Sequence, residues 1–401
     1  MGKGERIRDG RYELIDVAGR GGMAVVWRAT QHGDVGFKRT VAVKQMHDHL
    51  SESQLYIDMF AEEARVCAAM QSPNMAQVYD FVREDDRYYL VLEWIDGIDL
   101  GSLIRHFTKR EQQMPWEMSA AIGVGVLRAL ADAHEREDED GNVCPILHRD
   151  ISPHNILITQ RGMVKLIDFG LCLAPDRKKD LTEPGVVKGK MSYLSPEIVQ
   201  GNRPTPKSDQ FSVGSVLWES LAGKKLFDGE NDFDVYTKIR EGQVAPIRPI
   251  RRDLPRAMVA VLQKSLATEA DNRFSSAREM GRELASVLKS ARTASKDLHA
   301  LIGRTVLDAR EHLDMGERTG DHSTTTPIAD PVIDQVTLPD NAGKSVAKKK
   351  RVEKNNADDD GTAAGRKKRG TAPIEAEASV ETSTKEERKG LLHRFPFFNR
   401  R

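Results

Sequence analysis

The stretch that decides the fold is LHRDISPHNILI, residues 147–158. Its first part is a polar loop, and its last residues are apolar and β-branched, which predicts a short strand. The turn QRG, residues 160–162, leads to a second strand over residues 163–167, and the motif DFG follows at residues 168–170. The sequence therefore predicts a hairpin with polar side chains just before its first strand and just after its second.

A glycine-rich turn lies near the start of the chain, between two predicted strands. It consists of Gly19, Arg20, Gly21, Gly22, Met23 and Ala24. Glycines let the backbone approach an anion closely and point amide groups at it, although the same pattern also occurs in plain hairpin turns. Lys44 lies in a third, alternating strand and adds a cation. Together the turn and Lys44 form a candidate phosphate site.

A lysine among apolar neighbours needs a carboxylate partner, and the predicted helix over residues 51–70 offers Glu62 and Glu63. Side chains three and four residues apart share a helix face. At these distances Glu63 has apolar neighbours, whereas Glu62 has charged ones. Because a carboxylate on an apolar face is unfavourable unless it is paired, Glu63 is the predicted partner of Lys44. A glutamate at the helix rim, reaching to solvent, is the alternative.

Taken in order, the glycine-rich turn, Lys44, Glu63, the stretch 147–158 and the DFG motif resemble the eukaryotic-type (Hanks-type) protein kinase family, in its bacterial Ser/Thr branch. The resemblance implies an α+β, bilobal protein-kinase-like fold. We expect an antiparallel β N-lobe with one helix, a mainly α-helical C-lobe, and ATP in the cleft between them. The expected segments are a lead-in (1–11), the kinase domain (12–290, with its N-lobe at 12–95 and its C-lobe at 96–290), a helical extension (291–316) and a disordered charged tail (317–401).

The resemblance also implies a role for each polar residue of the site. Asp150 would accept the hydrogen bond of a substrate hydroxyl, and Asn155 and Asp168 are oxygen ligands suited to Mg²⁺. Lys44, tied to Glu63, would hold the α- and β-phosphates under the glycine-rich turn. The other expected nucleotide contacts are Val26, Ala42 and Leu157 against the adenine, the backbone of Glu93 and Ile95 at its edge, and Asp99 at the ribose.

Four further residues are expected to be structural. By the resemblance, Glu197 pairs with the buried Arg273, and Asp209 braces the catalytic loop. His148 is expected to support the loop rather than act as a base, since the family's base is the aspartate that corresponds to Asp150.

Three positions depart from the family pattern. Ala24 stands where a third loop glycine is usual, a change of one methyl group. Ser152 replaces the lysine that contacts the γ-phosphate, and Lys190 replaces the threonine that pairs with that lysine. We expect Lys190 to reach the cleft beside Asp150 and Ser152 and to restore the lost charge. The alternative is a pseudokinase, a nucleotide-binding scaffold that recruits partners through its C-lobe and tail.

A regulatory phosphate is expected next to the catalytic loop. In the family, an arginine at the position of Arg149 often binds a phosphate on the segment after the DFG motif. Thr182 is the only hydroxyl residue between Gly170 and Gly189, and its phosphorylation would add about two negative charges beside Arg149. We expect either autophosphorylation at Thr182 or an activity in which the neighbouring acidic residue, Glu183, substitutes for it.

Composition limits the compartment and the partners. Lys and Arg total 61 and so do Asp and Glu, and this balance argues against a polycation that works on nucleic acid. Three scattered cysteines form no disulfide framework, residues 1–9 lack the apolar core of a signal peptide, and no apolar run reaches the roughly 20 residues of a membrane span. The expected location is therefore cytoplasmic, without a membrane span.

The C-terminal part of the chain is poor in large apolar groups. Residues 275–394 hold no Phe, Tyr or Trp, which leaves little area to offset the entropy of ordering. Helical periodicity persists in a stripe that contains Leu298, Leu301, Ile302 and Leu307. The apolar and basic patch at residues 391–398 is a weak signal for docking of a partner.

The sequence as a whole predicts an ATP- and Mg²⁺-dependent serine/threonine protein kinase in bacterial cytoplasmic signalling. Protein substrates and self-association for autophosphorylation are the expected interactions.

Overall fold

The computed structural model describes residues 3–138, 140–169, 191–291 and 295–318. All of them belong to one compact unit, Met1–Val336, and a second unit covers Thr337–Arg401. The expectations for residues 319–401 therefore lie outside the described residues.

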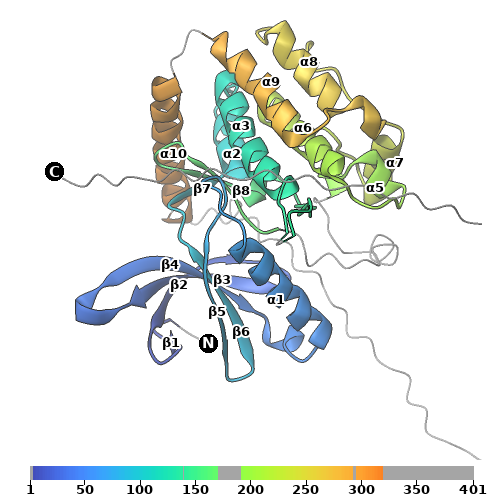
Figure 1. Cartoon of the computed structure of the whole chain (residues 1–401). Coiled ribbons are helices and arrows are strands. Elements are labelled where there is room, and N and C mark those ends of the chain that lie inside the picture. The colour runs from blue at the N-terminus through green and yellow to red at the C-terminus, as the bar shows by residue number, and fades with distance from the viewer. Residues whose placement is uncertain (1–2, 139, 170–190, 292–294, 319–401) are drawn as a thin grey trace, which may run out of the picture. The chain divides into compact units, whose positions relative to one another are not determined.

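The N-terminal lobe is built on a six-stranded antiparallel sheet in the order β1-β2-β3-β4-β6-β5 (Figure 1). The strands are β1 (Arg6–Ile7), β2 (Tyr12–Arg20), β3 (Ala24–His32), β4 (Lys38–Met46), β5 (Val78–Glu84) and β6 (Arg87–Glu93). Side chains of Leu14, Ala29 and Val43 are buried in one core of this sheet. Helix α1 (Gln54–Ala68) packs Phe60 against Met46 and so lies beside the strand that carries Lys44.

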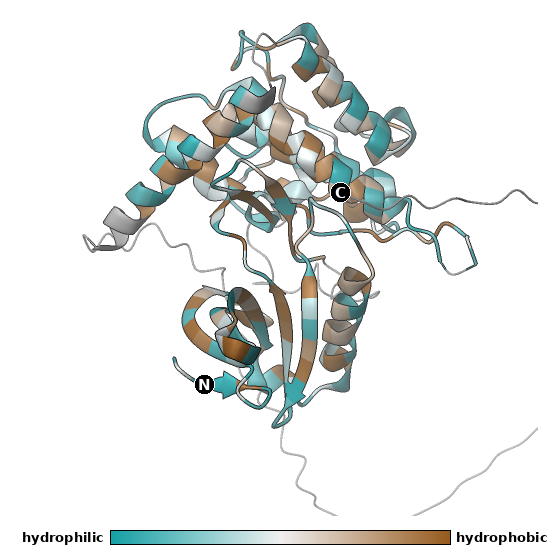
Figure 2. Cartoon of the chain, turned by 60° about the vertical axis from the view of Figure 1, so that its left-hand side comes forward, coloured by the Kyte–Doolittle hydropathy of each residue, from teal (hydrophilic) through white to brown (hydrophobic). Residues whose placement is uncertain are grey.

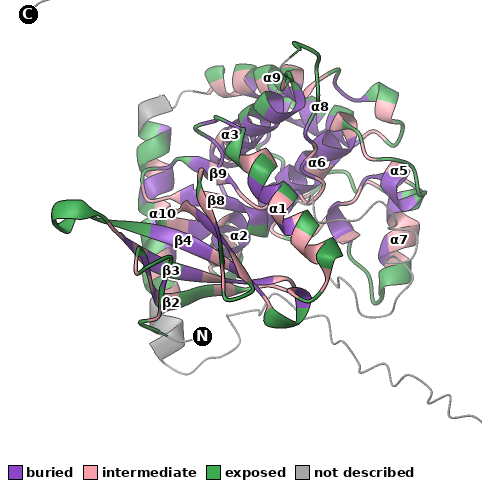
Figure 3. Ribbon diagram, turned by 60° about the horizontal axis from the view of Figure 1, so that its bottom comes forward, coloured by how far each residue is buried: buried purple, intermediate pink, exposed green. Residues whose placement is uncertain are grey.

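The second lobe is mainly helical and contains a small three-stranded sheet. Its strands are β7 (Gly97–Asp99), β8 (Ile156–Thr159) and β9 (Val164–Leu166), and its helices are α2 (Leu100–Lys109), α3 (Trp116–His134), α5 (Pro196–Val199), α6 (Pro206–Ala222), α7 (Asp232–Arg240), α8 (Arg256–Ser265), α9 (Ala277–Lys289) and α10 (Ser295–Arg318). Figure 3 shows α3 and α6 largely in the buried colour. Figure 2 shows polar and apolar residues on the same outer helices, as expected for helices with one buried face.

Two features of sequence fix the centre of this lobe. Gly123 on α3 lies so close to α6 and α9 that a Cβ there would be 2.8 Å from the side chains of Leu217 and Leu284, so a larger residue would force both leucines to shift. Helix α6 begins with a capping box between Thr205 and Ser208, has proline at its first position, and ends at Gly223 with φ 72°. These signals hold Asp209 in the buried first turn of α6.

The two-lobed α+β fold expected from the sequence is confirmed, with three corrections. Residues 6–7 of the expected lead-in form β1, which pairs with β2. The helical extension begins at Ser295 rather than 291. Of the expected apolar stripe, Leu298 and Ile302 are buried and Leu301 is partly buried, but Leu307 is 41% exposed and Val306 is buried instead. Leu307 follows Leu298 by about two and a half helical turns and so lies on the opposite face. In the described part of the chain, none of the helices is long and apolar enough to cross a membrane.

Candidate active site

A lysine and two carboxylates meet where the two lobes face each other. Lys44 projects from β4, and its Nζ lies 2.8 Å from Oε1 of Glu63 on α1 and 2.9 Å from Oδ1 of Asp168. Glu63 is only 4% exposed. Burial acts to lower the pKa of Lys44, but the charges of Asp168 and Glu63 outweigh it and hold that pKa well above its ordinary value. The lysine is therefore a fixed positive charge.

The choice between the two helix glutamates is confirmed. Glu63 faces Lys44, whereas Glu62 is half exposed and pairs with Arg65 one turn along the same helix. The apolar neighbours of Glu63 turn its helix face inward, and the buried cation then satisfies the carboxylate.

The catalytic loop orients Asp150 through Asn155. Nδ2 of Asn155 donates hydrogen bonds to the backbone oxygen of Asp150 (2.8 Å) and to its carboxylate Oδ2 (2.9 Å). The backbone N–H of Ile167 donates to the oxygen of Asn155 (3.0 Å), which ties the loop to the residues just before Asp168. The loop and the DFG segment are thus one hydrogen-bonded unit.

The same residues fit a divalent cation. With Nδ2 of Asn155 committed to Asp150, its amide oxygen is the remaining ligand atom, and the Asp168 side chain is 42% exposed. One amide oxygen and one carboxylate form the incomplete oxygen set that Mg²⁺ accepts when phosphates and water complete it. Within the described residues no three His, Cys, Asp or Glu side chains are grouped so that they could hold a metal ion by themselves.

Asp209, in the first turn of α6, holds the backbone of the catalytic loop, as expected. Its carboxylate accepts hydrogen bonds from the backbone N–H groups of His148 (2.9 Å) and Arg149 (3.0 Å) and contacts Nε2 of His134 at 2.8 Å. Burial acts to raise the pKa of Asp209, but its contacts with His134 and His148 prevail and the pKa lies below its ordinary value. Arg149 has φ 64° and Asp168 has φ 53°, and these sparsely populated conformations persist because the surrounding bonds hold them.

His148 supports the loop as a neutral ring. The backbone N–H of Asp150 donates to its Nδ1 (3.3 Å), so the proton lies on Nε2, which donates to the oxygen of Ile167 (3.0 Å). Burial lowers its pKa, and the ring packs 4.7 Å from the ring of Phe169. This arrangement agrees with the structural role expected for His148.

The glycine-rich turn joins β2 to β3 and is tied to the strand behind it. The N–H of Gly21 donates to the oxygen of Ala24 (2.9 Å), and His47 reaches the turn twice: its Nε2 lies 2.7 Å from the oxygen of Gly21, and its backbone N–H donates to Met23 (3.0 Å). Ala24 is not among the residues with positive φ. The methyl group at this position is therefore compatible with the turn.

The expected adenine and ribose contacts lie on adjoining strands. Val26 lies opposite Lys44 in the pairing of β3 with β4, and Leu157 lies opposite Asp99 in the pairing of β7 with β8. Each of these two apolar residues is therefore next to a polar residue of the site. Asp99 caps α2 by accepting from the N–H of Ser102 (3.0 Å) and contacts His154 (3.1 Å). Burial opposes ionisation of Asp99, but these contacts outweigh it and its pKa lies below the ordinary value. Ala42 lies on β4 opposite Leu92, Glu93 ends β6, and Ile95 lies between β6 and β7.

The departures from the family pattern are only partly visible. Ser152 is 3% exposed and begins the short 3₁₀ helix Pro153–Asn155. Lys190 and Thr182 lie outside the described residues. Nε of Arg149 is buried and has no hydrogen-bond partner among the described residues. This N–H group can therefore donate to an acceptor from elsewhere.

Contacts of two residues, Lys165 and His47, were not predicted from the sequence. Lys165 of β9 pairs with Glu93 at 2.7 Å and so ties the small sheet to the start of the connection between lobes. Its pattern, a lysine alternating with apolar residues, is the same signal that marked Lys44. The pair between Glu197 and Arg273, with Nη1 and Oε1 2.7 Å apart, is confirmed. The contact of His47 has no sequence signal, because it joins a histidine to a backbone oxygen.

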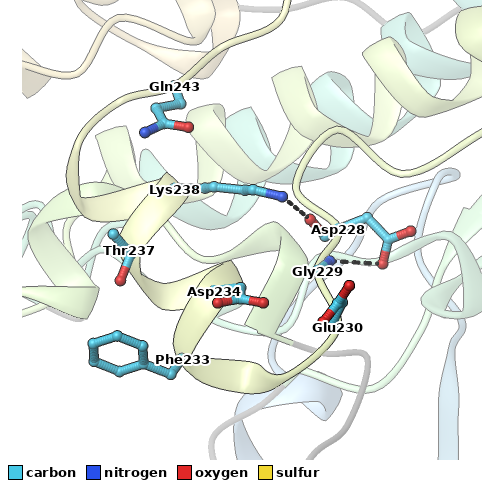
Figure 4. A pocket seen from close by; sticks show the side chains of 8 residues that line it. All are labelled: Asp228, Gly229, Glu230, Phe233, Asp234, Thr237, Lys238 and Gln243. Atoms are coloured by element: carbon cyan, nitrogen blue, oxygen red, sulfur yellow. Dashed lines mark hydrogen bonds between the residues drawn. The ribbon is translucent and has the colours of Figure 1, made fainter.

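A separate hollow of about 720 Å³ lies beside α7 (Figure 4). Its lining includes Asp228, Glu230 and Asp234, and Nζ of Lys238 donates to the backbone oxygen of Asp228 (2.6 Å). An acidic lining repels phosphates, so this hollow is not the phosphate site.

Comparison with known proteins points to one family. A family model described as "Protein kinase domain" matches residues 12–285. Tyrosine-protein kinase MasK of Myxococcus xanthus is 33% identical over 279 residues, or 70% of this chain and 43% of that protein. Serine/threonine-protein kinase PrkC of Bacillus subtilis is 32% identical over 293 residues, or 73% of this chain and 43% of that protein. The chain thus spans less than half the length of these two curated relatives.

The fold has solved counterparts as well. The crystal structure of the Mycobacterium tuberculosis PknI kinase domain superposes with a TM-score of 0.52 at 24% identity, covering 72% of this chain and 99% of that one. This likeness concerns the fold.

Proposed function

Because the chain belongs to the protein kinase family, in its eukaryotic-type bacterial branch, we propose that it transfers the γ-phosphate of Mg·ATP to hydroxyl groups of proteins. The observations that carry the proposal are the pairing of Lys44 with Glu63 and Asp168 and the hydrogen bond between Asn155 and Asp150. A fixed cation, oxygen ligands for a metal and an oriented carboxylate are the parts that phosphoryl transfer requires.

In the proposed reaction, Lys44 holds the α- and β-phosphates and Asp150 accepts the hydrogen bond of the incoming hydroxyl. The hydroxyl oxygen forms a bond to the γ-phosphorus while the bond from that phosphorus to the β–γ bridging oxygen breaks. The hydroxyl proton passes to Asp150, and ADP leaves. Bound Mg²⁺, held by Asn155 and Asp168, would supply positive charge to the phosphates. The residues of the chain contribute position and charge.

Ser152 and Lys190 extend the proposal to the residues that depart from the family pattern. A hydroxyl at Ser152 cannot neutralise the γ-phosphate as a lysine does, so we assign that charge to Lys190. The alternative is the nucleotide-binding scaffold. Incubation with labelled ATP and Mg²⁺, beside Asp150→Asn, separates the two: label in the wild type alone supports the enzyme. ATP binding with no label in either protein would refute the kinase activity and support the scaffold.

Serine and threonine are the acceptors we propose, in keeping with the description of PrkC as a serine/threonine-protein kinase. Tyrosine is a second candidate, because MasK is described as a tyrosine kinase and this chain lacks the threonine that accompanies serine/threonine specificity in the family. Phosphoamino-acid analysis of the labelled protein decides between them: phosphotyrosine alone would overturn the first choice.

Autophosphorylation, self-association and a place in bacterial signalling complete the proposal. Thr182 is the proposed acceptor within the chain, with Arg149 as the group that binds its phosphate, and the buried Nε of Arg149 supports that assignment. The cytoplasmic location and the docking role of residues 391–398 stay predictions. Phosphopeptide mapping of active protein tests the Thr182 assignment. If Thr182 is unmodified in active protein and the Thr182→Ala variant is inactive, both autophosphorylation at Thr182 and its replacement by the charge of Glu183 are refuted.

A further inference from the structure

Helix α10 lies outside the residues matched by the family, yet it is packed into the second lobe. Leu298, Ile302, Val306 and Ala309 are at most 5% exposed and belong to the same core cluster as Ile98 of β7. Figure 1 shows α10 alongside α2 and β7, and these elements are in contact. The buried stripe is apolar and spaced by three and four residues, so it is a helix face built for this surface.

The backbone of α10 lies directly against the backbone of the turn between β8 and β9. A Cβ on Gly303 would overlap the backbone oxygen of Gln160, and a Cβ on Gly162 would lie 2.5 Å from the backbone oxygen of His299. Gly162 also has φ 75°. Glycine on each side of this contact therefore lets α10 rest directly on the turn that follows Leu157, the expected floor of the adenine site.

The other end of α10 reaches the segment that joins the two lobes. Arg310 pairs with the carboxylate of Asp96, which directly follows Ile95. Asp96 also holds the β8–β9 turn: its carboxylate accepts from Nε2 of Gln160 (3.0 Å), and its backbone oxygen accepts from the N–H of Gln160 (3.2 Å). Asp96 is thus a junction between α10, the small sheet and the connection between the lobes.

A third contact fixes the helix that begins at the expected ribose residue. Oδ2 of Asp308 lies 3.2 Å from Nε2 of His106 and 3.7 Å from Nη2 of Arg110, near the C-terminal end of α2. Asp99 caps the start of α2. Contacts from α10 therefore flank Asp99, at Asp96 before it and at the far end of α2 after it.

We propose that α10 is a positioning element for the nucleotide site: through Arg310 on Asp96 and Gly303 on Gln160, it holds the backbone that presents Ile95, Asp99 and Leu157 to ATP. The inference rests on the proposed function. By linkage, a helix that favours the nucleotide-bound arrangement must itself be stabilised when nucleotide binds. Arg310 and Gly303 act through the residues they hold, and neither is expected to touch ATP.

The test measures nucleotide affinity of the full chain, without phosphate transfer. Titration calorimetry with Mg²⁺ and a non-hydrolysable ATP analogue would compare the wild type with Arg310→Ala, Gly303→Val and the rescue variant Arg310→Lys. Arg304→Ala is the matched control, because Arg304 is an exposed residue of the same helix. We expect Arg310→Ala to raise Kd about two- to fivefold, as an exposed ion pair allows, Arg310→Lys to recover most of that loss, and Gly303→Val to raise Kd on the order of tenfold.

Hydrogen exchange supplies the reciprocal measurement. Addition of the analogue should slow amide exchange over residues 298–312 in the wild type, and less so in Arg310→Ala. Equal Kd values for Arg310→Ala, Gly303→Val and the control would overturn the inference and leave the proposed function intact, even if melting shows that the variants are less stable. A wild type that binds no nucleotide would overturn both. If Gly303→Val does not fold, the Arg310 series still decides.

Discussion

Removal of the charge of Glu63, with its shape kept, tests the core of the site. In Glu63→Gln, Lys44 loses the carboxylate 2.8 Å from its Nζ and keeps only Asp168, 2.9 Å away. Asp168 is also the proposed metal ligand, so the lysine and the cation would then compete for one carboxylate. Glu62→Gln is the matched control, since Glu62 lies on the same helix but pairs with Arg65 at the surface.

The expected magnitude follows from the geometry. A hydrogen bond to a charged partner is worth about 1.5–3 kcal/mol, and each 1.4 kcal/mol is about tenfold in rate. We therefore expect Glu63→Gln to lower kcat/KM for Mg·ATP by about tenfold to 150-fold, while Glu62→Gln changes it less than about twofold.

The assay is steady-state phosphate transfer at varied ATP and Mg²⁺, with a melting curve for each variant. Because the proposed competition is for Asp168, excess Mg²⁺ should recover part of the loss in Glu63→Gln. Activity of Glu63→Gln within threefold of the wild type, or an equal loss in Glu62→Gln, would refute the reasoning that the buried carboxylate positions Lys44.

Four further predictions concern individual residues. Lys190→Ala should lower kcat about a hundredfold with little change in ATP affinity, and Lys188→Ala should not; near-full activity of the first would refute the assigned role. His47→Ala should raise KM for ATP about two- to tenfold by freeing the glycine-rich turn, and His47→Gln, which keeps a donor, should recover part of it; no change in either variant would contradict the tie. Asp209→Ala should lower the free energy of unfolding by about 3–5 kcal/mol, because it leaves buried donors unpaired; a change below about 1 kcal/mol in a denaturant titration would be inconsistent with that bracing role. Finally, burial lowers the pKa of His148 and His106 in the folded state, so as pH falls these histidines take up protons in the unfolded chain before they do so in the folded one. The stability that is present above about pH 6.5 should therefore fall as pH drops toward 5.5. A Tm that stays constant over this range would contradict this prediction.

Much of the site could be predicted from the sequence because its chemistry is local. The residues from 147 to 158 carry Asp150 and Asn155 at a fixed spacing, and the structure joins them by a direct hydrogen bond. The choice of Glu63 over Glu62 needed only helix periodicity. For Glu63 the pattern of neighbours already says which way the side chain faces, whereas the roles of Asp150 and Asn155 were implied by the resemblance to the kinase family.

The remaining contacts join residues that only the folded structure brings together, so no periodic pattern in the sequence indicates them. His47 binds a backbone oxygen of the glycine-rich turn, and any residue supplies such an oxygen. Arg310 meets Asp96 across 214 positions of sequence. The apolar stripe of α10 was predicted correctly at Leu298 and Ile302 and wrongly at Leu307. Val306 is buried instead, because it follows Ile302 by four residues and so shares its helix face.

Buried pairs between a charged side chain and its partner explain how the site keeps its geometry across distant segments. Lys44 with Glu63 joins a strand to a helix, Asp209 holds the catalytic loop from α6, and Arg273 with Glu197 joins segments 76 positions apart. Pairs of this kind add little net stability compared with apolar residues, but removal of one partner is strongly unfavourable. They therefore act as constraints on position, and the strained φ of Arg149 and Asp168 can persist only under such constraint. A replacement such as Ser152, which alters one charge in the cleft, leaves all three pairs in place. Its effect should fall on the rate of transfer, and the fold should be unchanged.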